Sequence, residues 1–407
     1  MNILYLIHQF YPWHYTGTEK FLLNLTTMMQ KWGHKVKVVT YGLYDQALYT
    51  YATNEYSVLE FHYKGIPVEE FRLTQEPADL NWGLENAGVV EYAEKTLERE
   101  KPDILHIAHG MRVSEFAFAA QRLNVPYVLT LTDFFFICPK VKLLTSKGTL
   151  CSGPEKGEAC KTYCPEFAED SIRRRLALGE QILRGAQRVV APSQFLATLF
   201  QNEFPWLNLK VIPYGIDYNR TKRNVRVFDG TNELVILYAG QINYHKGVQI
   251  LIDAVRRITN NNFVVKLYGS GPPIIEQQLQ DMAQGDQRIQ FCGVYKEDEV
   301  GEVFGAADLV IIPSIWHENN TIVMREALAS SIPVVVSNAG GMVEMVQEGV
   351  NGFVFRMGDA THLKDVLERI INHPELLSSM KKNVRSYAVT TVEQEAYAYE
   401  QEYRSIT

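Results

Sequence analysis

Short apolar runs rich in β-branched residues alternate with amphipathic segments along the whole chain, and this alternation limits the fold more than any other feature of the sequence. In the first half, the runs lie at residues 4–8, 36–41, 104–108, 127–131 and 188–191. Between the first two runs, Phe21, Leu25 and Met28 recur at helical spacing, and Gly33 stands where a helix would end. Strands that alternate with helices predict parallel sheets with helices on both faces.

The same alternation starts again after a polar stretch at residues 214–232. In the second half, the apolar runs lie at residues 234–239, 263–268, 289–293, 309–313 and 334–337. We therefore expect an α/β protein of two Rossmann-like, doubly wound domains that face each other across a deep cleft. The expected parts are an N-terminal domain over 1–213, a hinge at 214–232, a C-terminal domain over 233–390 and a helix over 391–407 that can cross back to the first domain.

The chain has 407 residues and a formal net charge of −7. A nucleic-acid-binding protein normally carries an excess of basic residues, so this class is disfavoured. No apolar run reaches the roughly 18 residues that span a bilayer, and the first residues lack the basic start and cleavage site of a signal peptide. Five cysteines are too sparse for a secreted disulfide framework. We expect a soluble cytoplasmic enzyme.

Two glutamates eight positions apart, Glu318 and Glu326, flank the expected start of a helix. Asn320 or Thr321 fits the N-cap position. The free N–H groups of a helix start form an anion site that suits a diphosphate. Glu326 would lie about 7.5 Å further along the helix axis, which is close to the distance from a diphosphate to the hydroxyls of its ribose. Two solvated glutamates beside an ordinary helix cap are the alternative at this point.

These glutamates and several glycine-rich turns resemble the motifs of family 4 (group 1) glycosyltransferases, which have the two-domain GT-B fold and carry a Glu-x7-Glu element. The resemblance covers nearly the whole chain, and the order and spacing of the segments are more specific than any one of them. The other matching segments are Gly240-Gln241-Ile242 with Lys246-Gly247, Gly269-Ser270-Gly271-Pro272, Phe291-Cys292-Gly293-Val294-Tyr295, Gly340-Gly341-Met342-Val343-Glu344, Ala191-Pro192-Ser193 and Tyr214-Gly215-Ile216-Asp217.

The resemblance implies transfer of a sugar from a nucleotide diphosphate, so the charge of the leaving diphosphate has to be stabilised. No two aspartates stand two positions apart, so no Asp-x-Asp metal motif is present, and we expect Lys246 to supply the main cation. Gln241 stands where the family usually has an arginine, which removes one charge. Glu318 is expected to bind sugar hydroxyls without a covalent role. The implied donor-binding residues are Gly17, Gly240, Gln241, Lys246, Gly269, Tyr295, Asn319, Asn320, Thr321 and Glu326.

In the first half, the family pattern Gly-Gly-x-Glu is met by Thr16-Gly17-Thr18-Glu19, with Thr16 in place of the first glycine. Gly17 would let the donor approach the backbone at a helix start. The family often has Asp-x-x-His-x-His where this chain has His106 and, one position late, His109. We assign His109 to the donor sugar and His106 to packing, although a strand bulge would invert that choice. Glu19 and Asp133 are assigned to the acceptor.

The segment at about 134–168 departs from strand–helix alternation and holds four of the five cysteines, Cys138, Cys151, Cys160 and Cys164. Four cysteines can hold a structural zinc, but this spacing lacks the usual close pairs, and free thiols or a disulfide are equally compatible with it. A helix with five arginines between 173 and 188 follows. Such a helix can lie on anionic lipid or can simply face solvent.

We therefore predict a retaining, metal-independent hexosyltransferase that uses a nucleotide sugar, UDP-glucose or a similar compound, and needs no cofactor. The acceptor would be a saccharide or a lipid-linked saccharide in bacterial polysaccharide synthesis, with peripheral contact at the inner face of the membrane. A nucleotide-sugar 2-epimerase of the same fold and a non-catalytic nucleotide-sugar-binding protein are the alternatives. A dehydrogenase is disfavoured because a Gly-x-Gly-x-x-Gly fingerprint follows neither first strand.

Overall fold

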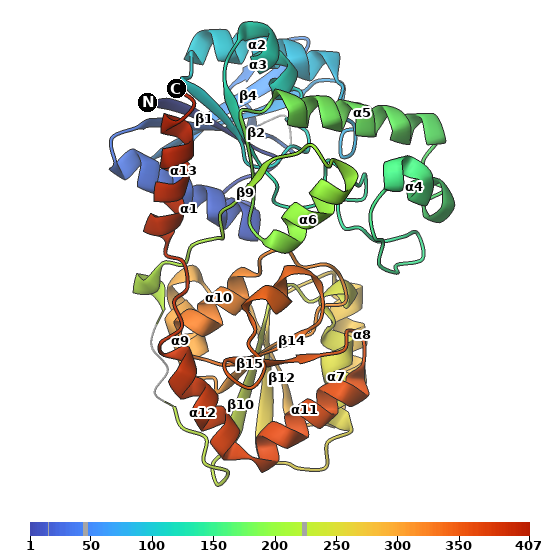
Figure 1. Ribbon diagram of the computed structural model, residues 1–407, viewed down its shortest axis with the longest axis vertical. Helices are drawn as coiled ribbons and strands as arrows, with labels where there is room; N and C mark the ends of the chain where they lie inside the picture. Colours follow the sequence, from blue (N-terminus) through green and yellow to red (C-terminus); the bar gives the residue numbers. More distant parts are fainter. Residues whose placement is uncertain (15, 44–47, 222–225) are drawn as a thin grey trace. The chain divides into compact units, whose positions relative to one another are not determined.

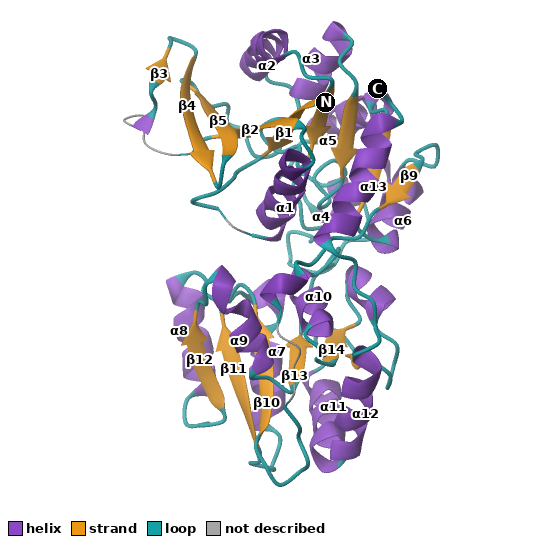
Figure 2. Ribbon diagram, turned by 90° about the vertical axis from the view of Figure 1, so that its left-hand side faces the viewer, coloured by secondary structure: helices purple, strands orange, loops and turns teal. Residues whose placement is uncertain are grey.

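The computed structural model describes residues 1–14, 16–43, 48–221 and 226–407, so part of the expected hinge, 222–225, lies outside the described residues. The chain divides into two units (Figure 1). Met1–Tyr214 and Val392–Thr407 form the first unit, and Gly215–Thr391 form the second. Each unit has a sheet with helices on both of its faces (Figure 2), the doubly wound arrangement that strand–helix alternation predicts.

The first unit contains a nine-stranded sheet in the order β3-β4-β5-β2-β1-β6-β7-β8-β9. Strand β1 lies in the middle, parallel to β2 on one side and to β6 on the other. The strands are β1 (Asn2–Ile7), β2 (Lys35–Tyr41), β3 (Tyr51–Ala52), β4 (Tyr56–Tyr63), β5 (Ile66–Leu73), β6 (Ile104–Ile107), β7 (Tyr127–Thr130), β8 (Arg188–Ala191) and β9 (Leu209–Val211).

Three strands at one edge of this sheet depart from the predicted parallel pattern. β3 and β4 pair antiparallel, as do β4 and β5, whereas β5 runs parallel to β2. β5 contains the buried neighbours Glu69 and Glu70, which are unexpected in a strand. The charge of Glu69 is balanced by Lys37 at 2.6 Å and Arg99 at 2.5 Å, from β2 and from the helix α2 (Ala87–Glu100). The sequence pattern misses this strand because its partners come from distant segments.

Among the described residues, the first unit has seven α-helices. The helix expected between the first two strands is α1, which ends before Gly33 at φ +85°. The helices are α1 (Gly17–Lys31), α2 (Ala87–Glu100), α3 (Phe116–Leu123), α4 (Glu158–Tyr163), α5 (Glu169–Gly185), α6 (Gln194–Glu203) and α13 (Val392–Arg404). Although α1 and α13 come from opposite ends of the chain, they pack against each other (Figure 1).

The second unit contains a six-stranded sheet, all parallel, in the order β12-β11-β10-β13-β14-β15. Its strands are β10 (Leu234–Ala239), β11 (Phe263–Tyr268), β12 (Ile289–Gly293), β13 (Leu309–Ile312), β14 (Val334–Ser337) and β15 (Gly352–Phe355). Its α-helices are α7 (Val248–Arg256), α8 (Pro273–Ala283), α9 (Val300–Gly305), α10 (Ile322–Ala329), α11 (Ala360–Asn372) and α12 (Pro374–Val384). The strands bury apolar side chains on both faces, as parallel sheets require.

The strand orders place a topological switch point in each sheet. In the second unit the chain begins at β10, winds outward through β11 and β12, and returns to β13 on the other side of β10. In the first unit the corresponding point lies between β1 and β6. In open α/β sheets, ligands bind beyond the carboxyl ends of the strands at such points, so the loops after these four strands are where a site is expected.

Candidate functional site

An ion pair spans the switch point of the second sheet. Lys246 ends a single 3₁₀ turn, Tyr244–Lys246, in the loop after β10, and Glu318 lies in the loop after β13. The Lys246 Nζ and Glu318 Oε1 atoms are 2.8 Å apart. Two side chains that the sequence singled out separately are therefore in direct contact. A half-buried ammonium group at this position is suited to an anionic ligand.

Three donors converge on the same oxygen of Glu318. Its Oε1 accepts hydrogen bonds from Lys246 Nζ, from Ser314 Oγ at 2.7 Å and from Trp316 Nε1 at 2.8 Å. Burial by itself raises the pKa of Glu318, but Lys246 and the two neutral donors outweigh it and hold the pKa below its ordinary value. In the described part of the chain none of these donors reaches Oε2, which is left to accept a hydrogen bond from a ligand hydroxyl.

Two glycines allow the loops around Glu318 to come this close. Gly247, at φ +75°, lies so near Pro313 that a Cβ would stand 1.8 Å from the Pro313 carbonyl oxygen. Gly340, at φ +65°, would place a Cβ 2.1 Å from the carbonyl oxygen of Glu318. The next residue, Gly341, donates its N–H to that oxygen at 2.6 Å. The loops after β10, β13 and β14 therefore pack backbone against backbone around the carboxylate.

The expected helix start is confirmed, since Thr321 is the N-cap of α10. Asn320 Oδ1 accepts a hydrogen bond from Arg325, and Asn319 is half-buried beside it. Glu326 is buried in the second turn, with 4% of its surface exposed. Burial of Tyr295, and to a smaller extent the charge of Glu326, raise the pKa of Tyr295. The loop after β12, which carries Tyr295, therefore lies near this helix.

The remaining predicted donor residues lie on the loops after β10 and β11. The N–H of Gly240 donates to Tyr268, and the N–H of Gly269 donates to Gly293, which joins three neighbouring loops. The side chain of Gln241 is exposed, while its carbonyl oxygen accepts a hydrogen bond from Tyr238 Oη at 2.6 Å. The predicted residues of the second unit thus lie on loops at the carboxyl ends of the strands of one sheet.

In the first unit, Glu19 closes the start of α1. Its Oε2 accepts hydrogen bonds from the N–H and the hydroxyl of Thr16, both at 2.6 Å, and Gly17 is exposed as the first residue of the helix. Glu19 is fully buried, and its Oε1 has no hydrogen-bond partner among the described residues. That oxygen lies 3.7 Å from His8 Nε2, at the end of β1.

Two histidine rings lie close together beside this carboxylate, tilted by 32° to each other. The rings of His8 and His109 have centroids 3.9 Å apart. His109 Nε2 lies 2.6 Å from Asp133 Oδ2, and its Nδ1 accepts the N–H of Met111 at 3.1 Å. Burial, followed by His109, Arg112 and His14, lowers the pKa of His8 well below its ordinary value, so His8 is neutral. His109, Asp133 and Glu19 therefore lie close together near the carboxyl ends of β1 and β6.

His106 faces the interior of the first unit. Its Nδ1 lies 2.6 Å from Tyr403 Oη of α13, and its Nε2 lies 2.8 Å from Thr130 Oγ1 of β7. Burial lowers its pKa to about 3. The packing role that the sequence suggests for His106 agrees with these contacts.

The sequence analysis did not single out His8, Ser314 or Trp316. His8 follows the first strand as His109 follows β6, and this shared position is a signal that could have found it. Ser314 and Trp316 are neighbours of Glu318 in sequence, but their hydrogen bonds depend on the path of the loop.

The structure gives no support to a structural zinc at the four clustered cysteines. Cys138, Cys160 and Cys164 are buried, Cys151 is half-buried, and all are free thiols. Within residues 1–14, 16–43, 48–221 and 226–407, no group of three or more His, Cys, Asp or Glu side chains is placed to hold a metal ion. Burial, followed by the other cysteines, raises the pKa of Cys160 to about 12. Burial also raises the pKa values of Cys138 and Cys151, which favours the neutral thiol form at these three positions.

Three of the four arginines of α5 pair with glutamates, whereas Arg175 is buried and donates to backbone carbonyl oxygens. The fifth predicted arginine, Arg188, lies on β8 and not on this helix. Arg173 pairs with Glu169, Arg174 with Glu85 and Arg184 with Glu180, at 2.5 to 2.7 Å. These pairs reduce the positive charge that the helix offers to anionic lipid. None of the helices that the structure describes is both long and apolar enough to cross a bilayer.

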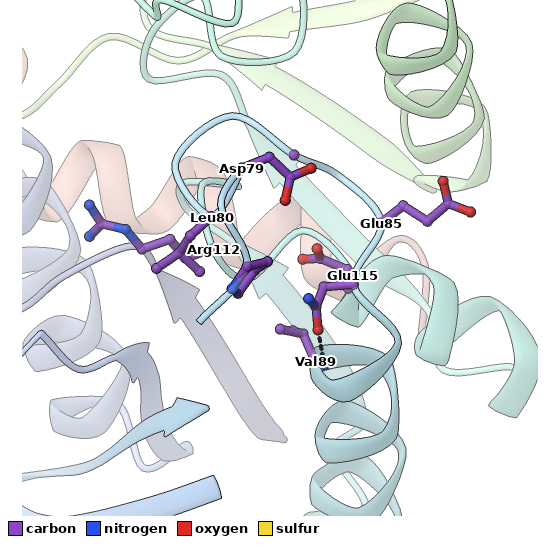
Figure 3. Close-up of a pocket in the computed structure, with 9 residues that line it drawn as sticks. Asp79, Leu80, Glu85, Val89, Arg112 and Glu115 are labelled. Atoms are coloured by element: carbon purple, nitrogen blue, oxygen red, sulfur yellow. Dashed lines mark hydrogen bonds between the residues drawn. The ribbon is translucent and has the colours of Figure 1, made fainter. Parts of the chain in front are cut away.

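A small pocket of the first unit is lined by none of the site residues that the sequence predicts (Figure 3). Asp79, Glu85 and Glu115 line it together with Arg112, whose guanidinium donates to Asn81 and to the carbonyl oxygen of His8. Burial raises the pKa of Glu115 to about 7.

Comparison with known proteins matches both halves of the chain to sugar-transfer families. Residues 15–220 match the family model described as Glycosyltransferase Family 4, and residues 220–387 match the model described as Glycosyl transferases group 1. The chain is 26% identical to an uncharacterised glycosyltransferase, MJ1607 of Methanocaldococcus jannaschii, over 79% of this chain and 76% of the relative. It is 23% identical to the N-acetyl-alpha-D-glucosaminyl L-malate synthase of Bacillus anthracis, over 91% and 87%.

Solved structures show the same fold. Alr3699/HepE of Anabaena, crystallised with UDP and glucose, has a TM-score of 0.72 at 21% identity over 100% of both chains. WaaG, a glycosyltransferase of lipopolysaccharide biosynthesis, has a TM-score of 0.69 at 17% identity, covering 100% of this chain and 99% of that one. Two Rossmann-like units, one with a mixed and one with a parallel sheet, and these neighbours identify the GT-B fold.

Proposed function

Because this chain belongs to glycosyltransferase family 4, we propose that it transfers a hexose from a nucleotide sugar to a hydroxyl group of a saccharide or lipid-linked saccharide acceptor. UDP-glucose is the proposed donor, supported by the related structure that was crystallised with UDP and glucose. The observation that carries the proposal is the Lys246–Glu318 pair at the switch point of the second sheet, where three donors bind Glu318 through the single oxygen Oε1.

The donor's diphosphate is proposed to bind to Lys246 and to the free N–H groups at the start of α10. A positive ammonium group and helix N–H groups stabilise the charge that collects on the diphosphate as the glycosidic bond breaks. Gly240, Gly269, Asn319, Asn320 and Thr321, on the loops after β10, β11 and β13, are proposed to surround the diphosphate, and Gln241 would contribute no charge to it. In this arrangement the residues present supply the positive charge, so the transfer is proposed to be metal-independent.

The two glutamates are proposed to hold the two ends of the donor. Glu326, buried beside Tyr295, would accept hydrogen bonds from the ribose hydroxyls, with Tyr295 near the base. Glu318 Oε2 would accept a hydrogen bond from a hydroxyl of the transferred sugar. A carboxylate whose other oxygen is fixed by three donors loses little freedom when it binds, which favours precise orientation of the sugar.

The first unit is proposed to supply His109 for the sugar and Glu19 and Asp133 for the acceptor. Asp133 holds one nitrogen of His109, so the histidine ring is oriented before ligands bind. Retention of configuration is proposed as a front-face reaction. The bond from the anomeric carbon to the diphosphate oxygen breaks, the acceptor oxygen bonds to that carbon on the same face, and the acceptor's proton passes to the released diphosphate.

The direct test combines donor screening with product analysis. A panel of UDP, GDP and ADP sugars is screened by thermal shift, because a ligand that binds only the folded state raises the melting temperature. The best donor is then incubated with saccharide acceptors, and the product is examined by NMR. A new glycosidic bond with the donor's anomeric configuration supports the proposal. An epimerised sugar with no acceptor consumed would indicate a 2-epimerase, and binding without turnover would indicate a non-catalytic binder.

A further inference from the structure

Trp316 joins the two charged groups of the second unit's site. Its indole N–H donates to Glu318 Oε1 at 2.8 Å, and the Lys246 ammonium lies 4.7 Å from the centre of its ring. The ring of His245 meets it edge-on, with centroids 5.1 Å apart. The N–H of Ile315 also donates to the carbonyl oxygen of His245 at 2.9 Å. The indole is therefore held in one orientation by contacts on both the loop after β10 and the loop after β13.

These contacts matter because, once a donor binds, Lys246 interacts with two anions, the Glu318 carboxylate and the donor's diphosphate. In the structure its ammonium is paired with Glu318. A bound diphosphate carries more charge than one carboxylate and draws the flexible lysine side chain toward itself. A buried carboxylate that loses its cation needs other hydrogen bonds to keep its charge and its position. Ser314 and Trp316 are the two donors that would remain on Oε1.

Of these two donors, Trp316 constrains the carboxylate more. A serine hydroxyl rotates and can donate elsewhere or accept, whereas an indole N–H donates only, in the plane of its ring. Packing of that ring against Lys246 and His245 fixes the direction in which the N–H points. The hydrogen bond from Trp316 therefore keeps the Glu318 carboxylate oriented even when Lys246 moves toward the diphosphate.

We propose that Trp316 is a positioning residue that keeps the Glu318 carboxylate in one orientation, with Oε2 toward the sugar, while Lys246 is shared between Glu318 and the donor's diphosphate. This inference rests on the proposed function, since it assigns Glu318 to the sugar and Lys246 to the diphosphate. It adds a residue that acts through Glu318 and that touches neither the sugar nor the diphosphate.

The kinetic test uses Trp316→Phe, which keeps an aromatic ring against Lys246 and His245 but removes the donor. We expect kcat for UDP-glucose to fall by about tenfold, with a much smaller change in KM. We also expect the acidic limb of the kcat profile to move to higher pH, because Glu318 loses a donor that favours its charged form. A loss of kcat with an unmoved acidic limb would indicate a structural role only and would overturn the inference, as would an unchanged kcat.

Trp206→Phe is the matched control. Trp206 Nε1 donates to Glu180 Oε1 at 3.1 Å, so this change removes the same kind of indole–carboxylate hydrogen bond in the first unit. We expect wild-type kcat and pH profile for this variant. Equal losses in both variants would contradict a specific role for Trp316.

A spectroscopic test does not depend on turnover. Labelling tryptophan with ¹⁵N gives five indole signals, since the chain has 5 Trp, and the Trp316→Phe variant assigns the one of interest. We expect this N–H signal to shift upfield in Glu318→Gln, where the hydrogen bond is weaker, and to keep its downfield position when UDP is added. An upfield shift on UDP addition would show that the bond breaks when Lys246 turns to the diphosphate and would overturn the inference. A protein with the expected signals but no activity on any nucleotide sugar would overturn the proposed function instead.

Discussion

Glu318 keeps a charge in a buried position because three donors point at one of its two oxygens. Glu326 is also buried but lies on the helix α10, beside the loop that carries Tyr295. The two residues look alike in the sequence, yet their surroundings suit different ends of one ligand. Their effects on binding and on turnover should therefore separate.

The first prediction compares Glu318→Gln with Glu326→Ala. Glu318→Gln keeps the shape of the side chain but removes the charge paired with Lys246, so kcat should fall by at least about 100-fold while UDP still binds. Glu326→Ala should weaken UDP binding by about tenfold or more, because hydrogen bonds to a charged group contribute about 1.5–3 kcal/mol. Calorimetric titration with UDP and steady-state kinetics measure both effects. Equal, negligible effects of the two changes would contradict the site assignment, and Glu368→Gln on the surface of α11 serves as the control.

The second prediction concerns Gly340. A Cβ at this position would stand 2.1 Å from the Glu318 carbonyl oxygen, and its φ of +65° is unfavourable for alanine. Gly340→Ala should therefore displace the Glu318 loop and lower both the melting temperature and kcat. Gly349→Ala has a similar φ of +72° but no atom within 4 Å of the added Cβ, so it separates backbone strain from the collision. Similar kcat values for the two variants would show that the contact with Glu318 is unimportant.

At this scale the sequence predicts the residue types well but their contacts poorly. The spacing of Glu318 and Glu326 and the position of Lys246 in a glycine-rich turn are visible in one dimension. The hydrogen bond from Trp316 and the close contact between the His8 and His109 rings are not, because the first depends on the path of one loop and the second on how two loops approach in space.

Among the elements, α13 comes from the far end of the chain and packs against the sheet of the first unit. Its residues Tyr399 and Tyr403 are fully buried and bond to Thr130 and His106 of the sheet. A polar network of this kind is stabilising only when each buried member has a partner. The stability that α13 contributes should therefore depend on its tyrosine hydroxyls as well as on its buried apolar area.

The third prediction tests this dependence with Tyr403→Phe. The change leaves His106 Nδ1 buried without its partner at 2.6 Å, which should lower the free energy of unfolding by about 1–3 kcal/mol. Tyr397→Phe removes the same hydroxyl from the exposed side of the same helix, where 58% of the residue is accessible, and should change it by less than about 0.5 kcal/mol. Denaturant unfolding measures both. Equal stability of the two variants would contradict the account of the network.

The elements that the sequence predicts correctly are those with strong apolar runs. The runs at 188–191, 234–239, 263–268, 289–293 and 334–337 coincide with β8, β10, β11, β12 and β14. The edge strands β3 to β5 were missed, because β5 carries two buried glutamates and β4 is only half covered. The charge of Glu69 is balanced by the distant residues Lys37 and Arg99, which a local pattern cannot reveal.

For the molecule as a whole, buried neutral histidines tie stability to pH. Burial lowers the pKa of His106 to about 3, whereas a histidine in the unfolded chain titrates near 6.5. Between these values the unfolded chain binds a proton that the native state does not. The free energy of unfolding therefore falls as the pH decreases, by up to about 1.4 kcal/mol per pH unit for this one group.

The fourth prediction isolates this group with His106→Gln, which retains hydrogen-bonding atoms but does not titrate. From pH 6.5 to pH 4, the wild type should lose more stability than the variant. Glu70 and Glu115, whose pKa values burial raises to about 7, act in the opposite direction but are common to both proteins and cancel in the comparison. Parallel pH curves, obtained by denaturant unfolding, would show that His106 is not the group responsible.

The most direct test of the central claim is a crystal structure of the protein with UDP-glucose bound. The account predicts a diphosphate in contact with Lys246 and the start of α10, the ribose hydroxyls on Glu326, and a glucose hydroxyl on Glu318 Oε2. A nucleotide sugar bound away from the carboxyl ends of β10 and β13, with the Lys246–Glu318 pair untouched, would contradict it.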